Sequence, residues 1–400
     1  MEFDPQERRR QRREKAEKRW QKRKQLLIRL GIGAAILALC IILVVAIFGK
    51  KSSDEPDTVV HIVFGGDVNV TDNVVASGGP GYDYTNTFID VASILGEADL
   101  SVVNFEGILY GAPYGTEGEG SAPQQLVEAL DRAGVDLIQL ANSYAMSRGG
   151  SSLGMTMDGV RAAGMEPVGV YASAEEAKEG KGYVLCDVGG VKVAFVAFTK
   201  GMQGKNMVAN YAGCVNVLYT DYNDNYQNVD TEGIKKALKE ASKSEAELII
   251  ALVHWGSEYD DIISSTQKEI LELMQANGVD AVIGTHAHRV QEMIFDKDKG
   301  TFVAYCLGDL IGDAPRSGAE YSVLLDLEIT KDGDTGEAKI SGFSYTPIFS
   351  VREEGKPVRV VRIRDAMKAY EGGYIDAVSD QTYEAMKYAL SRIEARVKGE

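Results

Sequence analysis

The chain has 400 residues, a formal net charge of −16 at pH 7 and 44% hydrophobic residues, so it is long enough to bury a large core. Its acidic balance argues against a protein that binds nucleic acid. Only four cysteines occur, and those beyond the first fifty residues are too widely spaced to form a disulfide framework: Cys186, Cys214 and Cys306.

The first 48 residues predict one membrane span preceded by a basic segment. Residues 1–25 are dense in Arg and Lys, and the apolar stretch 26–48 contains a single charged side chain, that of Arg29. The uncharged part, 30–48, is about as long as a helix that crosses a bilayer. A cleaved signal peptide is the rival interpretation. The apolar run is longer than a signal peptide requires, however, and no clear small-residue cleavage site follows it.

The charges that flank this stretch predict its orientation. The basic segment places the N-terminus in the cytoplasm, next to anionic lipid, and the main domain outside the cell. Lys50 and Lys51 argue weakly for the opposite orientation. Residues 1–51 carry 14 Lys/Arg and five Asp/Glu, a net charge of +9, which leaves −25 on the remainder. We therefore expect a single-pass cell-membrane protein with an acidic extracellular domain, whose charge serves either solubility or contact with cations.

After a polar linker at 49–57, apolar runs alternate with helical patterns. Such alternation predicts an α/β domain with a largely buried sheet. The expected strands are 59–64, 100–104, 136–141, 191–198, 248–253, 280–284 and 301–307. Apolar residues at spacings of three and four predict helices at 87–98, 122–134, 155–164 and 266–278. Most of these patterns end at a glycine that suits a helix C-terminus.

The last part of the chain changes character. Residues 321–330, 338–349 and 357–364 predict antiparallel strands that extend or close a sheet, and residues 364–400 predict a helical extension. We therefore expect one large domain at 58–363 with a two-sheet core, followed by the extension at 364–400.

Polar side chains gather where the apolar runs end. Open α/β sheets bind ligands in the loops at the carboxyl ends of their strands. The residues in such positions include three of the four histidines: Asp67, Asn69, Asn104, Glu106, Asn142, His254, Glu258, His286, His288 and Asp309. The fourth histidine, His61, alternates with apolar neighbours inside the first strand and is expected to be structural.

The pair His286 and His288 is ambiguous when taken alone. Two histidines on one extended segment can face opposite ways, and the ends of strands are polar in any case. Adding Asp67 and His254 at two other strand ends favours a metal site. Mixed nitrogen and oxygen donors favour Mn²⁺, Fe²⁺ or Zn²⁺ over an all-oxygen magnesium or calcium site. Two such ions could bind an anionic substrate and activate water.

In this order and spacing, the segments GGDVN, NFEG, ANS, HWGSEY, GTHAHRVQ and YCLGDL resemble those of the CapA family of capsule (poly-γ-glutamate) synthesis proteins. That family is related to the calcineurin-like metallophosphatases, and the resemblance spans about 59–315. It implies a four-layer α/β/β/α metallophosphatase-like sandwich behind the membrane helix. By position it implies these site residues: Asp67, Glu106, Asn142, His254, His286 and His288.

Three departures from the family pattern bear on catalysis. Where the family reads Asn-Asn-His, this chain has Asn142-Ser143-Tyr144, and Ala287 replaces a proline between the two histidines. Asp309 replaces the asparagine of the usual Gly-Asn-Phe. Tyrosine, with an ordinary pKa near 10, donates a hydrogen bond but is a poor proton shuttle at neutral pH. Tyr144 and His254 are therefore catalytic candidates, and the sequence leaves open whether the protein is an enzyme.

Two functions follow from the resemblance. In the first, a membrane-anchored protein of the bacterial surface helps to synthesise, export or anchor an anionic polymer such as poly-γ-glutamate, alongside membrane synthase or export partners. In the second, one or two divalent ions make it a phosphoesterase or hydrolase of the envelope. A surface domain with an inactive site is the remaining alternative. The scarcity of cysteine in an exported chain fits a bacterium, in particular a Gram-positive one.

Overall fold

A computed structural model describes residues 21, 24, 55–312, 316–374 and 378–399. The chain divides into two units, Met1–Pro56 and Asp57–Glu400. The predicted membrane span at 26–48 lies outside the described residues, as does nearly all of the basic segment before it. Within the described ranges, no helix is both long enough and apolar enough to cross a membrane.

Two sheets form the centre of the Asp57–Glu400 unit. The larger has eight strands in the order β14-β13-β12-β1-β2-β3-β4, with β11 paired to β1. These strands are β1 (Thr58–Asn69), β2 (Leu100–Glu106), β3 (Leu137–Gln139), β4 (Glu166–Val168), β11 (Asp309–Ile311), β12 (Tyr321–Lys331), β13 (Ala338–Val351) and β14 (Arg359–Arg362). The smaller sheet has six strands in the order β5-β6-β7-β8-β10-β9. They are β5 (Val184–Val188), β6 (Val191–Thr199), β7 (Leu248–His254), β8 (Ala281–Thr285), β9 (Met293–Asp296) and β10 (Thr301–Ala304).

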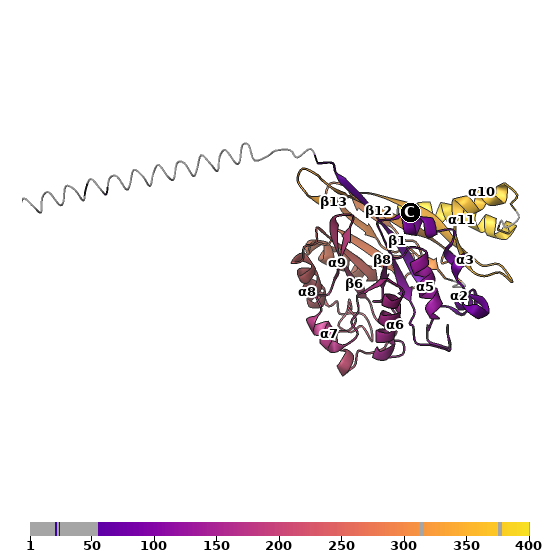
Figure 1. Ribbon diagram of the computed structural model, residues 1–400, viewed down its shortest axis with the longest axis horizontal. Helices are drawn as coiled ribbons and strands as arrows, with labels where there is room; N and C mark the ends of the chain where they lie inside the picture. Colours follow the sequence, from indigo (N-terminus) through magenta and orange to yellow (C-terminus); the bar gives the residue numbers. More distant parts are fainter. Residues whose placement is uncertain (1–20, 22–23, 25–54, 313–315, 375–377, 400) are drawn as a thin grey trace, which may run out of the picture. The chain divides into compact units, whose positions relative to one another are not determined.

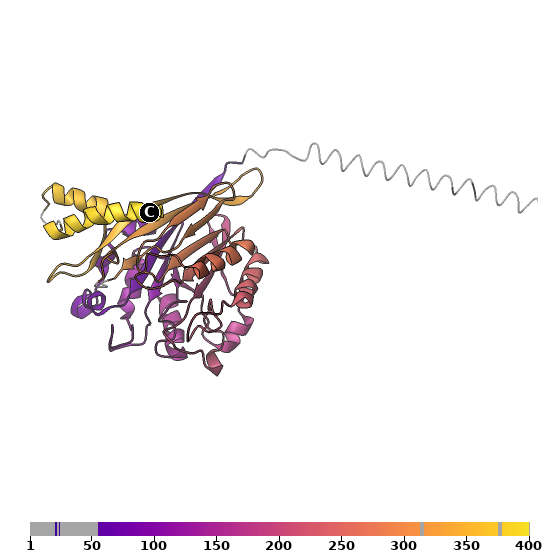
Figure 2. The ribbon, with the colours of Figure 1, turned by 180° about the vertical axis from the view of Figure 1, so that it is seen from behind.

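The two sheets pack against each other, and helices cover their outer faces (Figures 1 and 2). Along β6, Val193, Phe195 and Ala197 face the core between the sheets. The alternate side chains belong to a second core, shared with α8 (Thr231–Ser242) and α9 (Ser265–Ala276). The helices are α2 (Asp72–Ala76), α3 (Thr85–Phe88), α4 (Ala92–Glu97), α5 (Gln124–Arg132), α6 (Gly150–Ala162), α7 (Ala174–Glu179), α8 (Thr231–Ser242), α9 (Ser265–Ala276), α10 (Ile363–Glu371) and α11 (Asp380–Val397). The α/β architecture with a two-sheet core is thus confirmed, in four layers.

The expected elements match observed ones, with shifted ends and one correction. The strands expected at 301–307 and 357–364 are shorter, ending at Ala304 and Arg362. The helix expected at 87–98 is interrupted, because the chain turns at 89–91 between α3 and α4. The turn leaves Ile89 60% exposed while Phe88, Val91 and Leu95 stay buried. The single helix was predicted from apolar spacing, and the two short helices satisfy the same spacing.

The same helix-to-strand connection occurs once in each sheet and aligns its parallel strands. Gly134 and Gly278 end their helices at φ values of 98° and 86°, in the left-handed region that glycine adopts most easily. Two residues later, Asp136 accepts a 2.8 Å hydrogen bond from the backbone N–H of Ser101 in the neighbouring strand. Asp280 accepts the equivalent 2.8 Å bond from Ile249. Each carboxylate fixes the start of one strand against the neighbouring strand. The carboxyl ends of the paired strands therefore lie side by side at the same edge of the sheet.

Candidate metal centre

The carboxyl ends of strands from both sheets bring the polar residues together. In the larger sheet, Asp67 lies opposite Asn104 on one side and opposite Asp309 on the other. In the smaller sheet, His254 lies opposite Thr285, the residue just before His286. Asp67, Glu106, His254, His286 and Asp309 are at most 5% exposed. Five of the six predicted site residues therefore converge on one buried cluster, together with Asp309.

Asp67 joins the two halves of this cluster. One carboxylate oxygen accepts a hydrogen bond from the amide of Asn104 at 2.5 Å. The other accepts the backbone N–H of His286 at 3.0 Å and lies 3.5 Å from Nδ1 of His288. Burial, together with repulsion from Glu106, raises the pKa of Asp67 well above its usual value. Asp67 thus links the end of β1 to the turn that carries both histidines.

The glycine before Asp67 allows this approach. A Cβ on Gly66 would lie 1.7 Å from the carbonyl oxygen of Gly308, so only a residue without a side chain fits there. The same oxygen accepts the backbone N–H of Asp67 at 3.1 Å. The glycine of the GGD segment therefore serves the close contact that brings Asp309 beside Asp67.

His288 lies among three carboxyl groups. Its Nδ1 is 2.8 Å from Oδ1 of Asp309, and its Nε2 is 3.7 Å from Oε2 of Glu106. Burial opposes protonation of the ring, but attraction to Asp309, Glu106 and Asp67 outweighs that effect and raises the pKa of His288 well above its ordinary value. These carboxyl groups therefore favour the protonated form of the His288 ring when no metal ion is bound.

Glu106 and His254 form a second buried contact. Oε1 of Glu106 is 2.9 Å from Nε2 of His254, and Ser143 Oγ is 3.1 Å from the same nitrogen. Burial lowers the pKa of His254, which keeps the ring neutral, and raises the pKa of Glu106 to about 7. Thr285 Oγ1 lies 3.0 Å from Nδ1 of His254. A neutral ring that donates from Nε2 and accepts at Nδ1 satisfies these contacts.

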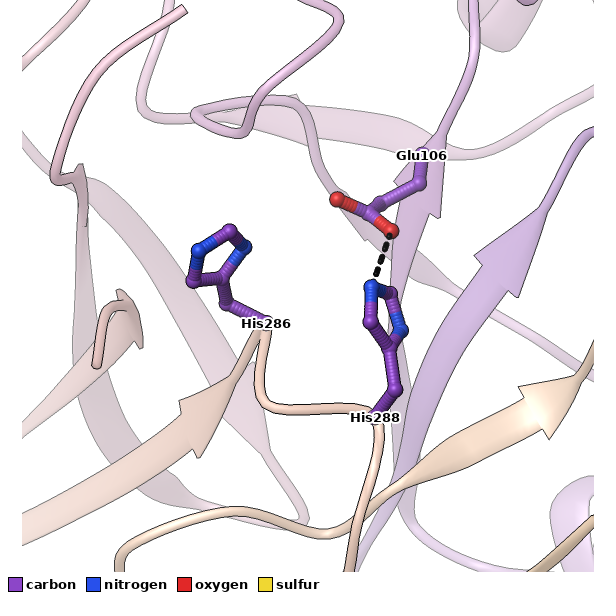
Figure 3. Close-up of side chains that lie close together, drawn as sticks. All are labelled: Glu106, His286 and His288. Carbon is purple, nitrogen blue, oxygen red and sulfur yellow. Dashed lines mark ion pairs between the residues drawn. The ribbon is translucent and has the colours of Figure 1, made fainter. Parts of the chain in front are cut away.

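His286 and His288 lie on a turn that follows β8, and their rings face the carboxylate of Glu106 from a different strand (Figure 3). Both residues have positive φ, 89° and 54°, a conformation that costs a non-glycine residue about 1–3 kcal/mol. Ligand atoms of Glu106, His286 and His288 lie within 4.8 Å of one another, and so do those of Asp67, His288 and Asp309. His288 belongs to both groups.

Two buried atoms of this cluster lack a hydrogen-bond partner among the described residues and suit a metal ion. Across the described ranges, Nδ1 of His286 and Oδ2 of Asp309 are buried without a hydrogen-bond partner. A buried polar atom without a partner is costly unless a bound group satisfies it. Neutral imidazole nitrogen with carboxylate oxygen is a donor set that first-row transition metals accept. The residues therefore fit a divalent ion of that class.

Asn142, the sixth predicted ligand, lies beside the cluster with its amide already engaged. Its Nδ2 donates to Oδ1 of Asn104 at 3.0 Å and to the carbonyl of Phe105 at 2.6 Å. Its Oδ1 accepts the backbone N–H of Tyr144 at 2.9 Å. Asn104, which bonds to Asp67, therefore stands between Asn142 and the centre. The role of Asn142 as a metal ligand stays a prediction.

A cleft of about 550 Å³ opens beside the cluster. Glu106 and His288 form part of its wall, together with Tyr144 and Tyr259. Burial raises the pKa of the Tyr144 hydroxyl above its ordinary value, so this group donates a hydrogen bond at neutral pH and does not act as a base. The ring of Tyr259 lies 5.1 Å from that of His288, centroid to centroid.

The structure adds residues that the sequence did not single out as ligands. Asp309 was recognised only as one more carboxylate near the site, yet it makes the shortest contact of His288. Ser143 contacts His254, and Asn104 bonds Asp67. The sequence feature that could have identified these residues was their position at the ends of predicted strands. His61 lies elsewhere on β1, where Nδ1 is 3.0 Å from Asp326, as expected for a structural histidine.

Divalent-ion affinity is expected to fall as the pH falls below 7. The carboxyl group of Glu106 has a pKa of about 7, so below that pH an ion must displace its proton. Displacement of the Glu106 proton by itself lowers the affinity for the divalent ion about tenfold between pH 8 and pH 6. Titration calorimetry at the two pH values, in buffers of different ionisation enthalpy, measures both the affinity and the protons released. Equal affinity at pH 6 and pH 8 would contradict this assignment.

The part of the chain that carries this cluster is similar in sequence to known proteins. Residues 61–314 match the family model described as "Bacterial capsule synthesis protein PGA_cap". The chain is 27% identical over 244 residues to the "Capsule biosynthesis protein CapA" of Bacillus anthracis, a match covering 60% of this chain and 56% of that protein. It is 26% identical over 247 residues to the "PGA biosynthesis protein CapA" of Bacillus subtilis (strain 168), covering 61% and 58%. The chain thus spans little more than half of each relative.

Solved structures with a similar course of the chain include a "novel phosphatase" from Mycoplasma pneumoniae. It is 14% identical, with a TM-score of 0.44, and the match covers 74% of this chain and 95% of that one. A hypothetical protein from Thermus thermophilus is 16% identical, with a TM-score of 0.42 and coverage of 72% and 98%. At these TM-scores, neither likeness bears on the chemistry of the cluster.

Proposed function

Because the chain belongs to the bacterial capsule synthesis protein family PGA_cap, we propose that it takes part in the synthesis, export or anchoring of an anionic capsule polymer such as poly-γ-glutamate. The observation that most directly supports a role for metal in this function is the position of His288, which belongs to two buried donor groups and also lines one cleft. We place the protein at the outer face of the cell membrane, anchored by residues 26–48 and next to synthase or export partners.

In this proposal, Asp67, Glu106, His286, His288 and Asp309 hold one or two divalent ions of the manganese, iron or zinc type. Once bound, such an ion would neutralise carboxylates and polarise an anionic ligand. The protein's own residues keep the donors in place. Asp67 fixes the histidine turn through the backbone N–H of His286, and Asn104 fixes Asp67.

The charge of the cleft supports a cation-dependent mode of polymer binding. Among the described residues, its wall includes the carboxyl groups of Asp72, Glu106 and Glu258 and no lysine or arginine. A polyanion would be repelled there by like charges at close range. Bound divalent ions reverse that balance, because they supply positive charge at the place where the polymer would approach.

We expect the purified full-length chain to bind poly-γ-glutamate in the presence of Mn²⁺ and to lose at least tenfold in affinity after chelation. The physical reason is that the cleft is acidic once the ions are removed. Fluorescence anisotropy of a labelled polymer measures the affinity, and a labelled neutral polysaccharide serves as the control ligand. Equal polymer binding with and without chelator would contradict the cation-bridged mode.

A metal-dependent hydrolase is the second candidate, favoured by a cleft that gives a substrate access to Glu106 and His288. Tyr144 weighs against it, because burial keeps its hydroxyl protonated in the place where the family pattern has a histidine. Turnover of a generic phosphodiester or a γ-glutamyl amide by the metal-loaded chain, abolished by His286→Ala, would favour the hydrolase. Polymer binding without turnover would favour the capsule-handling role.

A further inference from the structure

We infer that Arg396, at the C-terminal end of α11, is a positioning residue for the histidine turn and acts through Asp261 and Arg289. The inference rests on the proposed binding of metal by that turn. It adds to the site a residue from the C-terminal extension, which lies beyond the stretch 61–314 that matches the family model.

The first contact joins α11 to the loop that follows β7. Arg396 is 8% exposed, and its Nη2 lies 2.8 Å from Oδ1 of Asp261. Its guanidinium carbon is also 5.8 Å from the centre of the Tyr321 ring on β12. A guanidinium buried in this way is retained only where a charged partner compensates its loss of water. Arg396 therefore depends on Asp261 for a charged partner.

The second contact carries this constraint to the histidine turn. Oδ2 of Asp261 lies 3.2 Å from Nη1 of Arg289, the residue directly after His288. Arg289 also donates from Nη2 to the carbonyl of Ser317 at 2.7 Å. One carboxylate thus holds two arginines, one from the C-terminal helix and one from the turn.

Further bonds attach the same loop to the turn on both sides of His288. The backbone N–H of Tyr259 donates to the carbonyl of Ala287 at 2.9 Å. Nε2 of Gln291 donates to the carbonyl of Asp260 at 3.0 Å. These bonds therefore hold the loop around Asp261 against the turn, and Arg396 connects the loop to Tyr321 of β12 and to its own helix, α11.

The conformation of the turn explains why such support is required. His286 and His288 both adopt positive φ, which non-glycine residues hold only where their surroundings enforce it. When the Arg396 contact is lost, Asp261 keeps one arginine instead of two, and the loop loses its connection to α11. The turn can then relax toward ordinary backbone angles, and the rings of the two histidines separate from Glu106 and Asp67.

The test is the affinity for Mn²⁺ alone, measured by titration calorimetry on the full-length chain well below its unfolding temperature. Arg396→Met is expected to weaken binding by about tenfold or more, as is typical when a residue that orients ligands is removed. Arg396→Lys, which keeps the charge, is expected to recover part of the loss. The matched control is Arg364→Met, which breaks the exposed 3.2 Å pair between Arg364 and Glu394 in the same helical extension and leaves affinity unchanged.

Asp261→Asn keeps the test decisive if Arg396→Met does not fold, because the Asp261 side chain is 47% exposed and asparagine keeps its shape and one acceptor oxygen. It is expected to weaken Mn²⁺ binding by a similar factor. Urea unfolding of each variant separates the two roles, since a merely structural arginine would lower stability and leave the affinity unchanged. Unchanged affinity in a folded Arg396→Met or Asp261→Asn chain overturns the inference alone. Absence of Mn²⁺ binding by the wild-type chain overturns the metal site as well.

Discussion

Replacing His288 by alanine is expected to weaken divalent-ion binding by roughly 100-fold or more, because a lost ligand costs more than a lost supporting contact. His288 supplies a donor atom to both groups of potential ligands in the cluster. Its Nδ1 lies 2.8 Å from Asp309, and its Nε2 faces Glu106.

Calorimetric titration of Mn²⁺ or Zn²⁺ into the full-length chain measures this loss, and circular dichroism verifies that the variant is folded. His61→Ala is the matched control. His61 is the histidine outside the cluster, and its ring is 44% exposed beside Asp326. The control variant is expected to bind metal as the wild type does. A folded His288→Ala chain with unchanged affinity would exclude the cluster as the metal site.

Replacing Gly66 by alanine is expected to destabilise the protein by about 3 kcal/mol, near the upper end of the usual cost of overpacking a core. The added Cβ would lie 1.7 Å from the carbonyl oxygen of Gly308, which is backbone and cannot turn aside. β1 and the segment before β11 would have to separate. Asp67 and Asp309 would move apart with them, so metal affinity is expected to fall together with stability.

Urea unfolding, followed by circular dichroism, measures the loss of stability. Gly154→Ala is the control, because Gly154 lies within α6 and a Cβ there would meet no atom within 4 Å. That substitution is expected to stabilise the protein by about 0.5–1 kcal/mol, since alanine favours a helix over glycine. Equal stability of Gly66→Ala and the wild type would mean that β1 and the Gly308 backbone can separate at little cost.

Continuous apolar runs and helical apolar spacing were sufficient to predict most of the longer strands and helices of the fold. Strands such as β6 and β7 are buried on both faces and read as continuous apolar runs, which local patterns reveal. The helix expected at 87–98 shows where local patterns fail. Apolar spacing is the same for one helix as for two short helices around a turn, and only packing selects between them.

The sequence by itself also determined which residues could form the site, because polar side chains at the ends of buried strands are visible without a structure. Asp67, Glu106, His254 and the two histidines of the turn were all found in this way. Distances were not visible, because they depend on how two sheets pack and on strands far apart in the chain. The pairing of β1 with β11 decided that Asp309 lies opposite Asp67.

Only the tertiary structure decided what each polar group does. In the folded chain, the amide of Asn142 bonds to Asn104 and Phe105, and carboxyl groups surround His288. The tertiary structure also brought Arg396 within 2.8 Å of Asp261, although 135 residues separate them in the numbering. The physical reason is that hydrogen bonds and charge interactions act over a few ångströms in space. The sequence supplies the donors and acceptors, and the packing of the two sheets and α11 determines which of them meet.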